Sequence, residues 1–478
     1  MWPMFLMLMA GLSTAPMAEV AATVNGQAIL VREIDTPSSA KITKLQEELR
    51  ARAARAIDRL VDDRLRALAP TTPALSSSPA PITEEEIRAF RASRTEDFTG
   101  PLAPGGAARD PAVERAAIRY YLEQHARATA EVEVRRRLRE GHTVELFLPD
   151  VREIEQVLPA EREVARVDGV SIRAAELERA AALPLYRLRG EIYRERRRNM
   201  EAAIENLLLT QEARRRGVSQ QALLAKVSAG VTVSDEEVHA FIEAEQAAGR
   251  PVPTAERARP YLEFHKAYTR RQALLDQLRA VARIESLLKE PAAPRLPVVE
   301  AGAPGLGAQA GPRLVVYTNY RCTPCRVVHR EIDRLLAADR TVRVVFRDFI
   351  PVYDPVATGA ARLSRCAARL GAFARMRSEL LTREPPAFGQ PWYEEAALPS
   401  LASKLGIDPP AFRQCLFSAE IREAIERDTT HALELGFEEA PAFVAEGVPL
   451  SGLQSASGLA RALHQEPRPS QPRTKPPP

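Results

Sequence analysis

The tetrad Cys322-Thr323-Pro324-Cys325 joins a strand-like stretch to a helix-like one, and it constrains the fold of this chain more than any other feature. The apolar run at residues 314–317 predicts a buried strand before it. After it, apolar residues recur at helical spacing from Val328 to Leu336. Cys322 would then stand at a helix N-terminus, where unpaired N–H groups and the helix dipole favour a thiolate. The pattern therefore predicts two sulfurs that cycle between dithiol and disulfide.

A Cys-x-x-Cys pair is also half of a zinc site, which needs two more ligands at compatible positions. The other cysteines, Cys366 and Cys415, are isolated from each other and from the first pair. Between residues 313 and 464 the histidines are His329 and His431, and we predict that His329 lies on a solvated helix face. The spacing therefore favours redox chemistry, and we expect neither a metal nor a cofactor.

Cys366 and Cys415 lie in two further helix-like stretches, at residues 360–370 and 410–416. Two interpretations of these cysteines are open. The first is a pair of buried free cysteines, which pack as small apolar residues. The second is a structural disulfide, which suits an oxidising compartment and an even cysteine count. Neither interpretation gives these residues a catalytic role.

From residue 311 to residue 464 the chain resembles the thioredoxin-like domains of the DsbA-type disulfide oxidoreductases. The matching features are the strand, the tetrad, a second strand at 342–346, a helical insert, and a segment at 435–444 that looks like the family's cis-proline segment. The resemblance implies an α/β thioredoxin fold with a helical insert. It also implies thiol–disulfide exchange, in which Cys322 forms a mixed disulfide and Cys325 resolves it.

The resemblance further implies a substrate groove beside the sulfurs, lined by Arg321, Thr323, Pro324, Ala440 and Pro441, with Pro441 in the cis form. Two departures bear on the chemistry: Thr323-Pro324 stands where the family usually has Pro-His, and Ala440 stands where threonine or valine is common. Arg321, if exposed, lowers the pKa of Cys322 only weakly by its charge. An oxidase, an isomerase and a reductase all stay open, because redox poise decides among them.

Residues 1–18 combine an apolar run with small residues up to Ala18, which predicts a secretory signal peptide. No basic residue precedes the apolar run, and Pro16 is unusual just before a cleavage site. Export would bring the thiol chemistry into an oxidising space, so we expect a periplasmic location. No later segment is long and apolar enough to cross a membrane.

An internal repeat organises the region before the thioredoxin-like part. Four blocks recur in one order, residues 24–26 with 167–169, 56–61 with 203–208, 82–90 with 233–241, and 121–125 with 261–265. A duplicated module of about 130 residues is the simplest account. Each copy is predicted to contain a hairpin with an Asn-Gly or Asp-Gly turn, a long amphipathic helix, a capping box, a further helix and a β-type tail.

This order of elements resembles the N-terminal chaperone module of the SurA-type periplasmic folding factors, which usually carry a parvulin-class prolyl isomerase domain. The segments that could hold such a domain, 91–112 and 242–254, are far too short, so we expect no isomerase activity. The resemblance implies that the modules hold unfolded polypeptide. The alternative is that their apolar stripes bury one another and the modules serve as a spacer or a dimerisation element.

We therefore expect a multidomain chain with two mainly α-helical SurA-N-like modules followed by an α/β thioredoxin fold with a helical insert. The predicted parts are a signal peptide (1–18), module 1 (19–150), module 2 (156–290), a linker (291–311), the DsbA-like domain (312–465) and a disordered tail (466–478).

The predicted function is thiol:disulfide interchange on unfolded or cysteine-containing polypeptides, supported by a redox partner protein that is soluble or membrane-bound. The net charge is only +4, from 67 basic and 63 acidic residues, and does not attract nucleic acid strongly. No nucleic-acid partner is therefore expected. The alternatives are a non-enzymatic chaperone or docking protein, and a reductase dedicated to one partner.

Overall fold

The computed structural model describes residues 20–68, 81–93, 111–297, 302–352, 354–387, 390–450 and 452–464. The predicted signal peptide and the predicted tail lie outside these ranges. The chain divides into two compact units, Met1–Glu48 with Leu188–Pro291, and Leu49–Arg187 with Ala292–Pro478. Each unit is therefore built from segments that are far apart in the sequence. In the described ranges, no helix has the length and apolar character that crossing a membrane requires.

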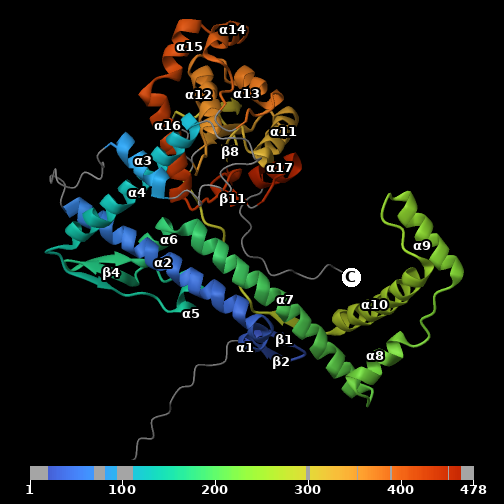
Figure 1. The fold of residues 1–478 in the computed structure, drawn as a ribbon. Helices are drawn as coiled ribbons and strands as arrows, with labels where there is room; N and C mark the ends of the chain where they lie inside the picture. The colour runs from blue at the N-terminus through green and yellow to red at the C-terminus, as the bar shows by residue number, and fades with distance from the viewer. Residues whose placement is uncertain are drawn as a thin grey trace, which may run out of the picture. The chain divides into compact units, whose positions relative to one another are not determined.

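The first unit is mainly helical. Its elements are β1 (Val20–Val24), β2 (Gln27–Leu30), α1 (Val31–Asp35), η1 (Thr36–Ser38), the start of α2 (Ser39–Leu68), most of α7 (Ala182–Arg215), α8 (Gln220–Ser228), α9 (Asp235–Ala247), α10 (Ala255–Val281) and β6 (Ile284–Ser286). The side chains of β1 and β2 pack on Met200, Ile204 and Leu208 of α7. Figure 1 draws α2 and α7 as long helices, of 30 and 34 residues.

The second unit contains a helical part and a thioredoxin-like part. The helical part comprises the rest of α2, α3 (Glu84–Ser93), α4 (Pro111–Arg139), β3 (Val144–Leu146), α5 (Val151–Ile154), β4 (Glu163–Val167), β5 (Val170–Arg173), α6 (Ala174–Ala180) and the first turns of α7.

The two predicted hairpins form with the same turn geometry. Asn25-Gly26 and Asp168-Gly169 adopt positive φ angles of 51° and 81°, and of 48° and 82°. Consecutive positive φ values match a type I′ turn, which Asn-Gly and Asp-Gly favour. The side-chain oxygen of Asn25 accepts a hydrogen bond from Arg283 N at 2.9 Å, and that of Asp168 accepts one from Thr143 N at 2.8 Å. Corresponding residues of the two copies thus make corresponding contacts.

The strands that close the two copies are exchanged. β6, at the end of the second copy, pairs with β1 of the first hairpin. β3, at the end of the first copy, pairs with β4 of the second hairpin. Each three-stranded sheet therefore takes its hairpin from one copy and its closing strand from the other. Local sequence patterns do not specify which of two similar strands is the partner, so this exchange was not among the predictions.

The thioredoxin-like part has a five-stranded sheet of order β11-β10-β8-β9-β7, in which β8 and β9 are parallel. Its elements are β7 (Gly305–Gly307), β8 (Arg313–Thr318), α11 (Thr323–Ala338), β9 (Arg343–Asp348), α12 (Pro355–Arg369), α13 (Phe373–Thr382), η4 (Glu395–Ala397), α14 (Leu398–Lys404), α15 (Pro409–Leu416), α16 (Ala419–Glu434), β10 (Ala442–Ala445), β11 (Val448–Leu450) and α17 (Ala456–His464). In Figure 1 these elements run from gold to red around β8.

Both faces of this sheet are covered. Alternate side chains of β8, β9 and β10 pack against α11 and α17 on one face. On the other face, Val315, Tyr317 and Val345 pack with α16, with Phe437 and with Leu183 of α7. The predicted helical insert is confirmed, with α12 to α15 forming a separate apolar cluster around Phe412.

Strand β7 lies inside the stretch predicted as a linker. It pairs with β9 at the edge of the sheet. A side chain at Gly307 would clash with the carbonyl oxygen of Val342, and one at Gly311 with that of Thr341. Gly307 and Gly311 are therefore required for close backbone packing.

The first turns of α7 contribute to the thioredoxin-like core. Leu183 is 2% exposed. Pro184 packs on Gly436 so closely that a side chain at Gly436 would not fit. Arg187 donates a hydrogen bond to Gly436 O at 3.1 Å and stacks on the Phe437 ring at 5.5 Å. A C-terminal fragment that starts at Ala292 would lack these side chains, so function is best tested in the full chain.

Candidate active site

The tetrad is held at the start of α11 by Asn319, which directly follows β8. Asn319 accepts a hydrogen bond from Cys322 N at 2.9 Å through Oδ1, and its Nδ2 donates to Phe349 O at 3.1 Å. Cys322 is the N-cap of α11, and Cys325 N lies 3.2 Å from its sulfur. Pro324 occupies the first helical turn, where its missing N–H leaves no intrahelical bond unmade.

The two sulfurs of the tetrad are bonded to each other, with a Cα–Cα distance of 5.2 Å. Cys325 is fully buried, whereas Cys322 is half-buried and Thr323 and Pro324 are exposed. Of the two sulfurs, that of Cys322 is therefore the one that an incoming thiol or disulfide reaches.

A second segment of the chain meets Cys322. The Ala440–Pro441 peptide bond is cis. Ala440 O lies 3.5 Å from Cys322 Sγ. The structure thus brings together Cys322, Cys325, Ala440 and Pro441, which the sequence analysis assigned to one site from distant positions.

Arg321 is partly buried and forms an ion pair. Its Nη1 lies 2.7 Å from Asp354 Oδ2, and its side chain is 28% exposed. Because Asp354 compensates its charge, Arg321 has little net effect on the charge balance at Cys322.

His329 is not on a solvated face, and that prediction was wrong. It is completely buried, between the rings of Tyr320 and Phe346. Arg377 Nε donates to its Nδ1 at 3.1 Å, so its Nε2–H donates to Thr318 Oγ1 at 3.2 Å. Burial holds the pKa of His329 well below its usual range, and the ring is neutral. Its position four residues after Cys325, on the same helix face, was the available signal.

The domain also contains a buried ion network that no sequence pattern predicted. Arg347 Nε donates to Asp428 Oδ1 at 2.8 Å, and Arg365 pairs with both Asp348 and Asp428. Burial raises the pKa of Asp348. Two arginines balance two aspartates, and together they connect β9, α12 and α16. The network holds the helical insert against the sheet that carries the tetrad.

Two buried tyrosines, Tyr317 and Tyr320, make the folding stability of the domain depend on pH in the alkaline range. Burial raises the pKa of Tyr317 and that of Tyr320 to about 12. The unfolded phenol has a pKa of about 10. The folded state favours the protonated phenols, so this contribution to stability is complete below pH ~10 and is lost as the pH rises through ~12.

We expect the urea midpoint of the oxidised protein to be clearly lower at pH ~11.5 than at pH ~9. The fluorescence of Trp392, which is 4% exposed, reports the transition. The difference between the two pH values should shrink in Tyr320→Phe, which removes one of the two phenols. An equal difference in this variant would contradict the assignment to Tyr320.

Cys366 and Cys415 form a second disulfide, across a sequence separation of 49 residues. It joins α12 to α15 inside the apolar cluster of the insert, and both cysteines are buried. It therefore lies away from solvent, in contrast to Cys322.

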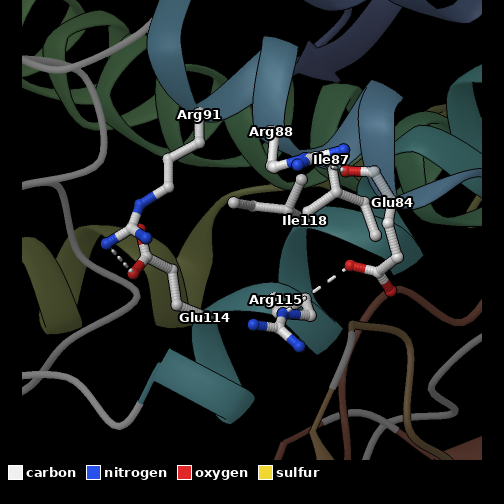
Figure 2. Close-up of a pocket in the computed structure, with 7 residues that line it drawn as sticks. All are labelled: Glu84, Ile87, Arg88, Arg91, Glu114, Arg115 and Ile118. Atoms are coloured by element: carbon white, nitrogen blue, oxygen red, sulfur yellow. Dashed lines mark hydrogen bonds and ion pairs between the residues drawn. The ribbon is translucent and has the colours of Figure 1, made fainter.

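A pocket of about 550 Å³ lies between α3 and α4, apart from the tetrad. Figure 2 shows Ile87 and Ile118 between charged side chains from both helices. Arg91 pairs with Glu114 at 3.1 Å, and Arg115 lies 3.8 Å from Glu84. These charges compensate one another, as on a solvated helix surface. Within the described ranges, no group of three or more His, Cys, Asp or Glu side chains is arranged to hold a metal ion.

The comparisons with known proteins agree with the fold of the C-terminal part. The family described as thioredoxin matches residues 302–465. The chain therefore carries a thioredoxin-like domain in its C-terminal part. No curated protein matches the chain. The resemblance of the repeats to SurA-type modules is not confirmed by these comparisons.

Several solved structures are similar to this part of the chain. A thioredoxin-like oxidoreductase from Silicibacter pomeroyi DSS-3 is 27% identical, with 34% of this chain and 90% of that chain covered and a TM-score of 0.30. The thiol-disulfide exchange protein alpha-DsbA2 from Wolbachia pipientis is 16% identical, with 34% and 87% covered and a TM-score of 0.30. Oxidised BdbD from Bacillus subtilis is 18% identical, with 36% and 96% covered and a TM-score of 0.32. At these TM-scores the likeness carries no information about substrates.

Proposed function

We propose that this chain is an exported thiol:disulfide interchange protein that acts on unfolded or folding polypeptides in the periplasm. One observation carries the proposal: the half-buried sulfur of Cys322 caps a helix, next to the buried sulfur of Cys325 and the Ala440 carbonyl. A redox partner protein would reset the pair after each turnover.

The reaction is a two-electron exchange between sulfurs. In the reducing direction, the Cys322 thiolate attacks one sulfur of a client disulfide, and the other client sulfur leaves as a thiolate. Cys325 then loses its proton and attacks Cys322 Sγ, which releases the second client thiolate and closes the Cys322–Cys325 disulfide. The oxidising direction is the same sequence reversed. The helix N-terminus favours the thiolate of Cys322 in both directions.

The repeats would supply clients, although not through their amphipathic stripes. Ala56, Ile57 and Val61, from one of these stripes, are completely buried and belong to the core. Apolar contact with a client therefore requires side chains that the fold leaves exposed. On α10, Phe264 is 71% exposed and Tyr268 is 50% exposed, and their rings lie 6.4 Å apart.

We expect the double variant Phe264→Ser/Tyr268→Ser to act about five- to tenfold more slowly on a disulfide-containing unfolded protein, because two exposed aromatic contacts are lost. Its rate with oxidised glutathione should be unchanged, since this small disulfide needs only the tetrad. Val281→Ser is the matched control, because Val281 is 85% exposed at the end of the same helix. Equal rates of the double variant and the wild type on the protein substrate would remove the recruiting role and favour a spacer.

A further inference from the structure

Arg326 directly follows the tetrad and is bound by four main-chain carbonyl groups. Its Nη1 donates to Tyr320 O at 3.4 Å and to Leu380 O at 3.0 Å. Its Nη2 donates to Leu381 O at 2.7 Å and to Arg383 O at 2.9 Å. The guanidinium group is thus fixed between the turn before Cys322 and the C-terminal end of α13.

Within the described ranges, the guanidinium group of Arg326 makes no ion pair. In the described part of the chain, no carboxylate lies within ion-pair distance of its guanidinium group, and its hydrogen-bond partners are all carbonyl oxygens. Three of these carbonyls, those of Leu380, Leu381 and Arg383, carry the partial negative charge of the end of α13, which is smaller than a full charge. A net positive charge therefore remains beside the first turn of α11.

The other charged groups around Cys322 do not supply such a charge. Arg321 is paired with Asp354. Glu438 is paired with Arg52 at 2.7 Å, and Glu439, exposed on the segment that leads to Ala440, is itself negative. His329, one turn further along α11, is buried and neutral.

We infer that Arg326 is a positioning residue that favours the thiolate of Cys322, with its guanidinium group fixed by the end of α13 in place of the histidine that DsbA-type tetrads contain. The inference rests on the proposed exchange at Cys322. A charge that favours the reduced, thiolate form also shifts the dithiol–disulfide equilibrium, so that the Cys322–Cys325 disulfide becomes the stronger oxidant.

The test compares two kinds of substitution in the full chain. Arg326→Met and Arg326→Gln both remove the charge, and Arg326→Lys keeps the charge while losing most of the carbonyl contacts. The readout is the alkylation rate of Cys322 as a function of pH in the reduced protein, measured by mass spectrometry of its peptide. Arg330→Met is the matched control, because Arg330 is exposed one turn further along α11.

We expect both neutral variants to raise the pKa of Cys322 and to lower its alkylation rate about three- to tenfold at pH values below that pKa. Arg326→Lys and Arg330→Met should titrate like the wild type. The equilibrium with glutathione should shift by the same factor towards the closed disulfide in the neutral variants alone.

Two results would overturn the inference: unchanged titration in both neutral variants, or an equal shift in Arg326→Lys, which would make Arg326 a structural clamp only. If Arg326→Met does not fold, the comparison of Arg326→Gln with Arg326→Lys decides the question. A wild-type Cys322 that does not exchange with glutathione at all would instead reject the proposed function.

Discussion

Cys322→Ser is expected to lose thiol–disulfide exchange, by at least about a thousandfold, with protein and small disulfides alike. A serine hydroxyl cannot form the mixed disulfide, and Cys325 is too deeply buried to replace it. Cys325→Ser should keep the first step and accumulate a mixed disulfide at Cys322, because the resolving sulfur is gone. The measurement is the rate of reduction of a protein disulfide, with the trapped adduct located by mass spectrometry.

The matched control for both variants is Cys366→Ala/Cys415→Ala, assayed at a temperature at which it is folded. It removes both sulfurs of the other disulfide and should keep the exchange rate. Two results would contradict the assignment of the nucleophile. One is wild-type activity in Cys322→Ser; the other is a mixed disulfide trapped at Cys325 in Cys322→Ser, with none at Cys322 in Cys325→Ser.

The second large effect is expected on stability. Removing the Cys366–Cys415 disulfide frees a loop with a sequence separation of 49 residues. On the chain-entropy estimate this costs about 4 kcal/mol, which corresponds to a fall in melting temperature of roughly 8–16 °C for a domain of this size. Trp392 lies in the same apolar cluster as the disulfide, so its fluorescence reports the unfolding of the insert.

The comparison for this prediction is the loss of the other disulfide. The Cys322–Cys325 loop has a separation of only 3 residues, so Cys322→Ser/Cys325→Ser should cost far less, about 1.5 kcal/mol on the same estimate. Equal losses in the two double variants would contradict the structural role of the Cys366–Cys415 disulfide.

The sequence predicted those elements whose signals are local. The apolar run at 314–317 lies in β8, and the helical spacing after the tetrad matches α11. The Asn-Gly and Asp-Gly turns form the hairpins that their residue types favour. In each case one short segment carries both the pattern and the structure that it specifies.

The features that the sequence did not predict depend on contacts between distant segments. His329 is buried because Tyr320 and Phe346 enclose its ring, and both of these residues lie outside α11. Leu183 belongs to the thioredoxin-like core although it lies in the second repeat copy. Three of the four carbonyl groups that fix Arg326 lie at the end of α13, so the sequence shows only an arginine after a cysteine.

The most direct test of the central claim is the equilibrium of the full chain in buffers of reduced and oxidised glutathione, with the state of each cysteine read from its peptide mass. We predict that Cys322 and Cys325 pass together between disulfide and dithiol, while Cys366 and Cys415 stay bonded throughout the same range. If Cys322 and Cys325 do not respond to the buffer, or if the two disulfides open together as the protein unfolds, the tetrad is not a redox site.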